Sequence, residues 1–236
     1  MNAATVLILT IVALLASAAH ANPILAKRGG SYYTWLKSGA GMTTFWTEQG
    51  SSGGQCLLDP PANGMAVALQ SNGLDNWGYT IASMCGVCIN IHNGGNSVVA
   101  RVIDKLANPE RGPGDLDVTG PVWRALTSDQ PGQLHDVWWE VVDCPDASGP
   151  LVYKWKEGSS QWWAGIQVRN HKKPVVSVIV NGQHPERQPY NYFVSNSGFG
   201  GPGPYTIQTW FEGGTSITDY NVQLQAGAEV KGSTWQ

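Results

Sequence analysis

Short strand-like segments separated by turn residues dominate the chain and constrain its fold more than any other feature. The chain has 29 glycines and 14 prolines, and turns such as Asn93-Gly94-Gly95 separate the apolar segments. Only residues 121–127, opening with Pro121 after Thr119-Gly120, carry the start signal of a helix. The sequence therefore predicts an all-β protein. The expected strands lie within 42–46, 64–70, 86–92, 97–104, 135–144, 151–156, 162–170, 175–182, 205–213 and 221–227.

The stretch Pro145–Pro150, PDASGP, has the composition of a linker and follows the last cysteine. Strand patterns continue after it without any cysteine. We therefore predict two β-domains, 29–147 and 148–236, the second of a size that suits a small sandwich.

The first 21 residues are typical of a secretory signal peptide. Val6–Ala19 is a short apolar run, and Ala19-His20-Ala21 places small residues where signal peptidase cuts. The run is shorter than the roughly 20 residues that a membrane span needs, although a bilayer anchor is the alternative. We expect a secreted protein with residues 1–21 removed and no membrane partner.

Cysteine usage agrees with secretion. An even number of cysteines in a secreted chain predicts two disulfides, and four cysteines allow three connectivities. Joining Cys56 to Cys85 and Cys88 to Cys144 would close two long loops, but the sequence alone does not decide among the three connectivities. Cys85 and Cys88 could instead form half of a zinc site or a redox pair, but no second such pair occurs in the sequence. We expect neither a metal nor a cofactor.

Charge and aromatic content indicate the class of ligand. A net charge of -3 and a charged fraction of 13% give no electrostatic footprint for DNA or RNA. The chain has 11 tryptophans but only 4 phenylalanines. Surplus tryptophan in a weakly charged chain favours stacking on an uncharged ligand, and carbohydrate is the leading choice. We expect a monomer.

Two aspartates are placed to do chemistry. Asp104 ends an expected strand, and Asp117 precedes the expected helix, so both can lie at the rim of one groove. A carboxylic acid in a partly apolar groove can donate a proton to a glycosidic oxygen or bind a sugar hydroxyl. Asp117 could instead cap the helix, and Asp115 has the pattern of a solvated turn residue.

Several motifs resemble expansins and barwin-like proteins, in the order found in those families. They are Gly41–Trp46, Cys85–Cys88, Val102–Asp104, Leu116–Val118 and Val142–Pro145. Residues Lys156–Lys172 also look like the signature of the C-terminal domain of microbial expansins. The resemblance covers nearly all of the mature chain. It implies a six-stranded double-psi β-barrel followed by an immunoglobulin-like, cellulose-binding β-sandwich, and a protein that loosens plant cell walls without hydrolysing them.

The resemblance also implies site residues in the barrel. Asp117 matches the key groove aspartate of the family and Asp104 a second one, while Thr44 and Trp46 match the segment that lines the groove. The chain departs from bacterial members at Leu106, where a tyrosine is common, and in a longer loop between the two aspartates.

The same barrel resembles endoglucanases of glycoside hydrolase family 45, which raises the question of hydrolysis. An inverting enzyme needs an acid and a base on opposite sides of the bond. Asp117 matches the acid, but the base position holds Thr47, and Glu48 next to it is expected on the opposite strand face. We expect no hydrolysis. The alternatives are an endoglucanase that uses Asp104 as base and a purely carbohydrate-binding protein.

In the second domain the resemblance implies an aromatic surface that lies on cellulose and consists of Trp162, Trp163 and Tyr190, flanked by Lys156. A regular strand would send Trp162 and Trp163 to opposite faces, so a shared surface requires a bulge or a loop-like start. The other tryptophans considered, Trp138, Trp139, Trp155 and Trp210, are assigned to core or turn packing, and His171-Lys172-Lys173 to a basic turn.

Overall fold

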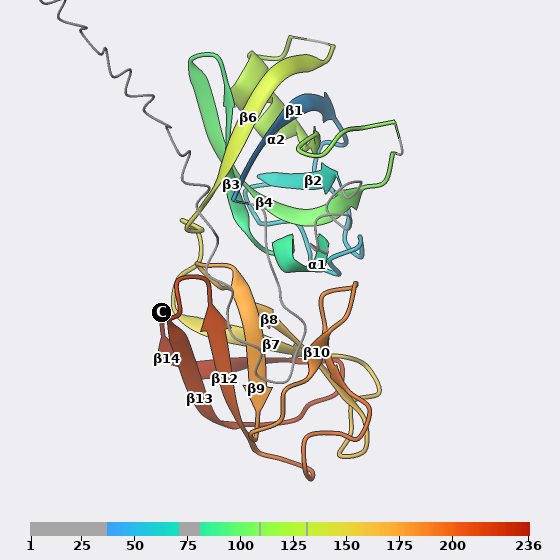
Figure 1. Ribbon diagram of the computed structural model, residues 1–236, viewed down its shortest axis with the longest axis vertical. Helices are drawn as coiled ribbons and strands as arrows, with labels where there is room; N and C mark the ends of the chain where they lie inside the picture. The colour runs from blue at the N-terminus through green and yellow to red at the C-terminus, as the bar shows by residue number, and fades with distance from the viewer. Residues whose placement is uncertain (1–36, 71–80, 109, 131) are drawn as a thin grey trace, which may run out of the picture.

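The computed structural model describes residues 37–70, 81–108, 110–130 and 132–236. The expected signal peptide, 1–21, lies outside the described residues. Within the described part of the chain, no helix is both long and apolar enough to cross a membrane. Figure 1 shows the two β-structures of the chain stacked along its long axis, with the barrel above and the other sheets below.

Six strands close into a barrel in the order β1-β5-β2-β4-β3-β6. The β1–β5 and β2–β4 pairs are parallel, and the other pairs are antiparallel. Closure removes the exposed sheet edges that would otherwise invite pairing with another chain. The strands are β1 (Ser38–Phe45), β2 (Ala66–Gln70), β3 (Cys88–Asn93), β4 (Asn96–Leu106), β5 (Leu116–Val118) and β6 (Leu134–Val142).

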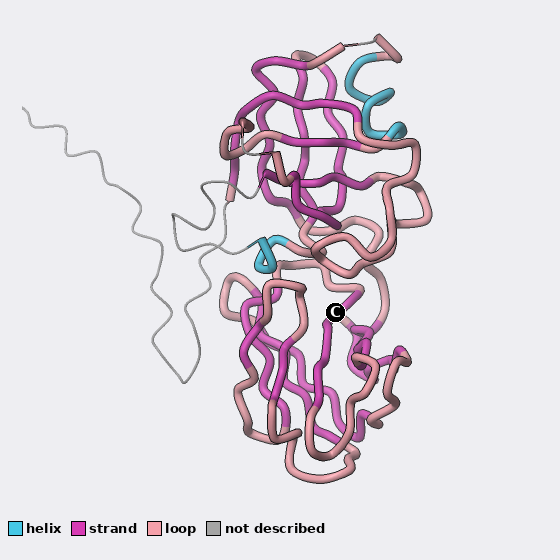
Figure 2. Tube along the Cα trace, turned by 90° about the vertical axis from the view of Figure 1, so that its right-hand side faces the viewer, coloured by secondary structure: helices cyan, strands magenta, loops and turns pink. Residues whose placement is uncertain are grey.

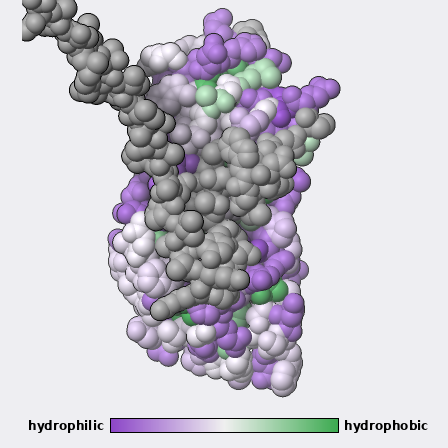
Figure 3. Space-filling view, viewed as in Figure 1, coloured by the Kyte–Doolittle hydropathy of each residue, from purple (hydrophilic) through white to green (hydrophobic). Residues whose placement is uncertain are grey.

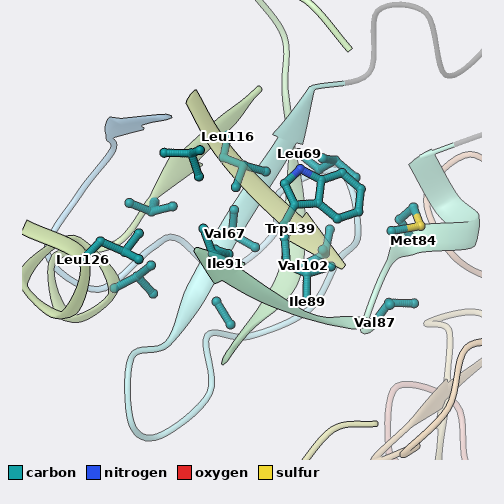
Figure 4. Packing of buried hydrophobic residues seen from close by; sticks show 14 of the residues in the cluster. Val67, Leu69, Met84, Val87, Ile89, Ile91, Val102, Leu116, Leu126 and Trp139 are labelled. Atoms are coloured by element: carbon teal, nitrogen blue, oxygen red, sulfur yellow. The ribbon is translucent and has the colours of Figure 1, made fainter. Parts of the chain in front are cut away.

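The barrel interior is filled by aliphatic side chains that alternate along the strands with outward residues (Figure 4). Trp139 is the largest of the interior side chains and is fully buried. Its indole N–H donates to the carbonyl of Gly114 at 2.9 Å, so the one polar atom of the ring is satisfied. The labelled members of the core are Val67, Leu69, Met84, Val87, Ile89, Ile91, Val102, Leu116, Leu126 and Trp139.

Among the residues described, two short helices accompany the barrel, α1 (Ile81–Met84) and α2 (Gly120–Thr127). The structure confirms the helix expected at 121–127. Pro121 stands in its first turn, where its missing N–H costs nothing, and Ser128 ends it in a left-handed conformation with φ of 53°. Figure 2 shows α2 at the far end of the barrel and α1 at the end that faces the sandwich.

The second half of the chain forms two antiparallel sheets that pack face to face. One has the order β10-β11-β8-β7-β14 and the other β13-β12-β9. Aromatic and aliphatic side chains from both sheets form the core between them, with Tyr153, Trp155, Phe193, Phe199 and Tyr205 as the largest members. The strands are β7 (Pro150–Trp155), β8 (Ala164–Arg169), β9 (Val175–Val180), β10 (Glu186–Arg187), β11 (Phe193–Ser195), β12 (Tyr205–Phe211), β13 (Ser216–Val222) and β14 (Glu229–Trp235).

One buried carboxylate joins the two sheets. Asp219 on β13 is fully buried and accepts hydrogen bonds from the main-chain N–H groups of Ser233 (2.6 Å) and Thr234 (2.8 Å) on β14. The hydroxyl of Tyr153 donates to its other oxygen at 2.9 Å. Burial raises the pKa of Tyr153, so the phenol stays protonated and remains a donor.

The all-β expectation is confirmed, with a closed six-stranded barrel followed by a β-sandwich. The two expected disulfides are present as Cys56–Cys85 and Cys88–Cys144, a connectivity that the sequence alone left open. Asp146 lies close to the Cys88–Cys144 sulfurs, but these are bonded to each other and are not thiolate ligands. The domain limits 29–147 and 148–236 stay a prediction.

The segment 55–57 of the barrel docks on the sandwich through main-chain carbonyls. The buried amide of Gln167 donates to the carbonyl of Cys56 at 2.9 Å, and Arg169 donates to that of Leu57 at 2.9 Å. The side chain of Gln55 donates to the carbonyl of Pro189 at 2.8 Å. The Cys56–Cys85 disulfide fixes this segment to the residue that follows α1.

His171 corrects one expectation from the sequence. It is buried at the contact between the domains, with Gly86 so close to its Nε2 that a Cβ there would collide with the ring. Burial first, and the charges of Arg101 and Arg187 next, lower the pKa of His171 to about 3. The expected basic turn is therefore a neutral packing residue followed by two exposed lysines, Lys172 and Lys173.

Candidate functional site

Four residues form a continuous row across four neighbouring barrel strands. Asp117 on β5 pairs with Thr44 on β1 and with Ala68 on β2, and Ala68 pairs in turn with Asp104 on β4. We call Thr44, Asp117, Ala68 and Asp104 the carboxylate row. Residues paired across a sheet project to the same face, so both carboxylates leave the barrel on one side.

The face that the row occupies follows from the alternation of the strands. Leu116 and Val118, on either side of Asp117, point into the barrel core. Asp117 must then point outward, which the sequence pattern Leu-Asp-Val encodes. The backbones that carry the two carboxylates are two strand spacings, about 10 Å, apart. Ala68, on the strand between them, contributes only a methyl group to this face.

Asp117 is a half-buried carboxyl group with one strong partner. The hydroxyl of Thr44 donates to its Oδ1 at 2.7 Å. Burial raises the pKa of Asp117 above its usual value, while the Thr44 bond and the charge of Arg111 oppose that rise. A carboxyl group in this state can accept a hydrogen bond from a sugar hydroxyl or, once protonated, donate one.

Asp104 has different partners. Its Oδ1 accepts the main-chain N–H of Gln55 at 2.6 Å and that of Lys105 at 2.8 Å. Gly54 lies so close to the carboxyl group that any Cβ at that position would collide with it. Asp104 therefore holds the 54–55 turn against β4.

The loop between the two aspartates holds a pair that the sequence patterns did not reveal. Asp115 was expected to be a solvated turn residue, and the structure contradicts this, because it is 7% exposed and forms an ion pair with Arg111 at 2.8 Å. Burial acts to raise the pKa of Asp115, but bonds from Arg111, Met42 N–H and Gly112 N–H outweigh it and hold the pKa below its usual value. The four-residue spacing of Arg111 and Asp115 was the available signal.

Trp46 lies beside the row rather than in it. It is partly buried against the cluster that contains the Cys56–Cys85 disulfide and Ile103. Its neighbour Phe45 is 43% exposed and packs edge-on against Trp123. Trp46 therefore packs beside the Cys56–Cys85 disulfide, directly after the end of β1.

The position that matches the base of family 45 endoglucanases is Thr47, whose side chain is hydrogen-bonded within a local turn. The Thr47 hydroxyl accepts the N–H of Gly50 at 2.7 Å within a turn. Glu48 is exposed and pairs with Arg124 of α2 at 3.0 Å. Neither side chain is a member of the carboxylate row.

The aromatic residues of the sandwich stand outside a regular strand. Strand β8 begins only at Ala164, so Trp162 and Trp163 belong to a bend and do not alternate as strand residues do. Ser160 fixes that bend, donating its N–H to Trp163 O at 2.7 Å and accepting the Trp162 N–H on its hydroxyl at 3.2 Å. Trp162 is 74% exposed, and Trp163 is half-buried.

Lys156 packs against two tyrosines of a neighbouring loop. Its ammonium group lies 5.4 Å from the ring centre of Tyr190 and 5.3 Å from that of Tyr192. Tyr192 is buried and was not singled out from the sequence, although it stands two residues after Tyr190. The residues expected from the sequence to form an aromatic surface, Lys156, Trp162, Trp163 and Tyr190, are called the aromatic platform.

A cleft of about 350 Å³ lies between the barrel segment 53–59 and the sandwich. Its lining includes Lys156 and Tyr192 beside the platform, and Asp59, Arg169 and Glu229 on the other side. Arg169 pairs with Glu229 at 2.6 Å and with Asp59 at 3.4 Å, so its charge is compensated from both domains.

The four tryptophans that the sequence assigned to core or turn packing bear out that expectation with one correction. Trp139 and Trp155 are fully buried, and Trp210 is partly buried. Trp138 is 46% exposed on the outside of the barrel, stacked 3.7 Å from His92 with nearly parallel rings. Figure 3 shows that the visible barrel surface is mainly hydrophilic with a few small apolar patches.

No family model matches the chain. Among curated proteins, it is 34% identical over 156 residues to Expansin-YoaJ of Bacillus subtilis (strain 168). The aligned region is 64% of this chain and 66% of that relative, slightly less than two thirds of its length. The crystal structure of an apo expansin from Clavibacter michiganensis matches with a TM-score of 0.71 at 25% identity, covering 84% of this chain and 96% of that one. The chain is thus similar to microbial expansins in both sequence and fold.

A second solved structure adds a ligand to the comparison. An aspartate-to-asparagine mutant of the Clavibacter michiganensis expansin, in complex with cellohexaose, matches this chain with the same TM-score, identity and coverage. The expansin fold of the chain thus extends over both the barrel and the sandwich. The resemblance stated from the sequence motifs is confirmed.

Proposed function

We propose that this chain is a microbial expansin, a secreted, cell-wall-associated protein that binds cellulose and other β-glucans and loosens walls without hydrolysis. The observation that carries the proposal is the combination of the carboxylate row on the barrel with the aromatic platform on the sandwich. The cellohexaose complex of the related expansin supports a β-glucan as the ligand.

In this proposal the two sites have separate roles. Trp162, Trp163 and Tyr190 lie on the apolar faces of glucose rings and hold the protein on cellulose, with Lys156 bonding hydroxyl groups. Each stacked ring hides roughly 80 Å² of apolar surface, which contributes about 2 kcal/mol before ordering costs. Three stacked rings together bind tightly enough to hold the protein on cellulose and weakly enough to let it dissociate and rebind.

The barrel then acts on a single glucan chain. Thr44, Asp117, Ala68 and Asp104 form the floor of a groove with Trp46 in its wall. Asp117 exchanges hydrogen bonds with sugar hydroxyls that would otherwise bond to neighbouring chains. Its half-buried position makes each such bond stronger than one made in open water.

Hydrolysis is the second candidate, and one observation bears on it. The base would have to be Asp104, whose carboxyl lies across Ala68 from Asp117. One oxygen of Asp104 is already occupied by two main-chain N–H groups at 2.6 and 2.8 Å. Those bonds hold the carboxylate to the 54–55 turn, which favours a positioning role.

The test measures sugar release, binding and wall extension on the same protein. The mature chain and its Asp117→Ala variant are incubated with swollen cellulose and mixed-linkage glucan, and soluble reducing ends and bound protein are quantified together. We expect equal binding, no release above that of the variant, and extension of wall strips under load by the wild type alone.

Asp143→Ala is the matched control, because Asp143 is an exposed carboxylate of the same half of the chain. It should extend wall strips like the wild type. Sugar release that disappears in Asp117→Ala would make the chain an endoglucanase. Undiminished extension by Asp117→Ala would remove the carboxylate row from the function.

A further inference from the structure

The guanidinium group of Arg111 makes three hydrogen bonds to residues outside the carboxylate row. Its Nε donates to Asp115 at 2.8 Å, and its Nη2 donates to the carbonyls of Met42 (2.8 Å) and Leu116 (3.2 Å). The side chain is 9% exposed, so little freedom remains. A guanidinium group fixed in this way presents its last nitrogen, Nη1, in one direction.

That nitrogen points at Thr44. The Nη1 of Arg111 donates to the Thr44 hydroxyl oxygen at 3.2 Å, and the same oxygen lies 2.7 Å from Asp117 Oδ1. Arginine can only donate, and an ionised carboxylate can only accept. The hydroxyl must therefore accept from Arg111 and give its single proton to Asp117.

We infer that Arg111 is a positioning residue of this site, acting through the hydroxyl of Thr44 on the carboxyl group of Asp117. The relay keeps Oδ1 of Asp117 as an acceptor. When Asp117 takes up a proton and both bonds are kept, that proton sits on Oδ2, the oxygen left for a ligand. The carboxyl group then has one oxygen for the protein and one for the glucan.

The charge of Arg111 has a second effect. Burial favours the protonated form of Asp117, and the nearby cation favours the ionised form. Arg111 thus lowers the pH at which Asp117 changes from acceptor to donor, together with the Thr44 bond and against the larger effect of burial. Asp115 compensates the cation, so the site carries no isolated buried charge.

The direct test is the pKa of Asp117 in variants of Arg111, read from the pH dependence of its ¹³C-carboxyl NMR signal. Arg111→Gln removes the charge and most of the fork, and we expect the pKa of Asp117 to rise. Arg111→Lys keeps the charge, and we expect it to restore most of the wild-type value. An unchanged pKa in folded Arg111→Gln would overturn the inference.

Arg124→Gln is the control, because Arg124 is an exposed arginine of the same half of the chain that pairs with Glu48 rather than with the row. It should leave the pKa of Asp117 unaltered. If Arg111→Gln does not fold, Thr44→Val supplies the second variant, since it deletes the middle of the relay and keeps the branched shape. The pKa of Asp117 should rise there too, and no rise would also overturn the inference.

A functional readout depends on the proposed function and is kept separate. The pH profile of wall extension should move to higher pH in Arg111→Gln, while cellulose binding through the platform stays as in the wild type. The NMR titration needs no glucan. If Asp117→Ala extends walls normally, the proposed function fails, and the titration still decides the role of Arg111.

Discussion

Asp104 and Pro189 share one partner, Gln55, although they lie in different halves of the chain. The N–H of Gln55 donates to the Asp104 carboxylate at 2.6 Å, and its side-chain amide donates to the Pro189 carbonyl at 2.8 Å. Pro189 directly precedes Tyr190 of the aromatic platform. The proposed groove and platform are therefore linked through a single residue of the docking segment.

The next residue of the docking segment, Cys56, accepts a hydrogen bond from the buried amide of Gln167, which should therefore contribute to stability. Gln167→Leu removes the donor to Cys56 O and the acceptor of the Arg169 Nε–H, which lies 2.6 Å from Gln167 Oε1. Leaving such groups unsatisfied costs about 1–3 kcal/mol. We expect that loss in the free energy of unfolding from urea titration. Gln208→Leu, at a half-buried site with only a 3.5 Å contact, should lose little, and equal losses would contradict the docking role.

Trp162 should contribute to cellulose binding without contributing to the fold. It is 74% exposed, so Trp162→Ala removes a stacking surface and no core contact. Loss of about 2 kcal/mol of burial, reduced by ordering costs, predicts binding about tenfold weaker in a depletion assay on crystalline cellulose.

Trp235 provides a matched comparison for that assay. It is 75% exposed on β14 and lies outside the platform. Trp235→Ala should bind cellulose like the wild type. Equal weakening in both variants would mean that any exposed tryptophan adsorbs to cellulose and that the platform has no special role.

Alternation and turn chemistry were enough to predict the strands that carry the site. Leu116-Asp117-Val118 places one polar residue between two core residues, and Pro121 is a start signal for the helix that follows this strand. The partnership of Asp117 with Ala68 and Asp104 could not be predicted, because it depends on a crossover that places β2 between β5 and β4. The bend at Trp162 was foreseen only as a requirement of the family resemblance.

The misassigned residues share one physical cause. Asp115 and His171 lie in polar, turn-like sequence, and both are buried by segments distant in the chain. Met42 and Arg111 surround Asp115, and Gly86 covers His171. Local patterns describe a residue's neighbours along the chain, whereas burial of a polar group depends on partners that only the tertiary fold supplies.

The two disulfides should contribute comparably to stability. In the chain-entropy model, the Cys56–Cys85 bridge, with a separation of 29, contributes about 3.6 kcal/mol, and the Cys88–Cys144 bridge, with a separation of 56, about 4.2 kcal/mol. Replacing either pair by alanine should lower the free energy of unfolding by about that amount.

Their effects on domain docking should differ. Cys56 presents its carbonyl to Gln167, so loss of that bridge should also speed proteolysis between the two halves of the chain. Loss of Cys88–Cys144 should destabilise the chain with a smaller effect on docking, although Cys144 N–H bonds Lys172 O at 2.8 Å. Equal rates of proteolysis between the two halves in both variants would mean that the Cys56–Cys85 bridge does not support domain docking.

His171 predicts an acid-sensitive contact between the domains. Its pKa is about 3 in the folded state and 6.5 without the fold. Above pH 6.5 both states are neutral, so His171 adds no pH dependence. Below pH 6.5 the unfolded chain binds a proton that the folded chain does not, and stability falls by about 1.4 kcal/mol per pH unit until the folded pKa is reached.

His171→Asn tests this, because its side-chain amide can keep the bond that the ring makes to Lys173 O at 2.9 Å and cannot titrate. Between pH 6.5 and pH 3, urea unfolding should show a flatter pH dependence in the variant than in the wild type. His184→Asn is the control, since His184 is exposed and should leave the slope unchanged. An equally steep slope in His171→Asn would assign the acid sensitivity to the carboxylates and not to the buried imidazole.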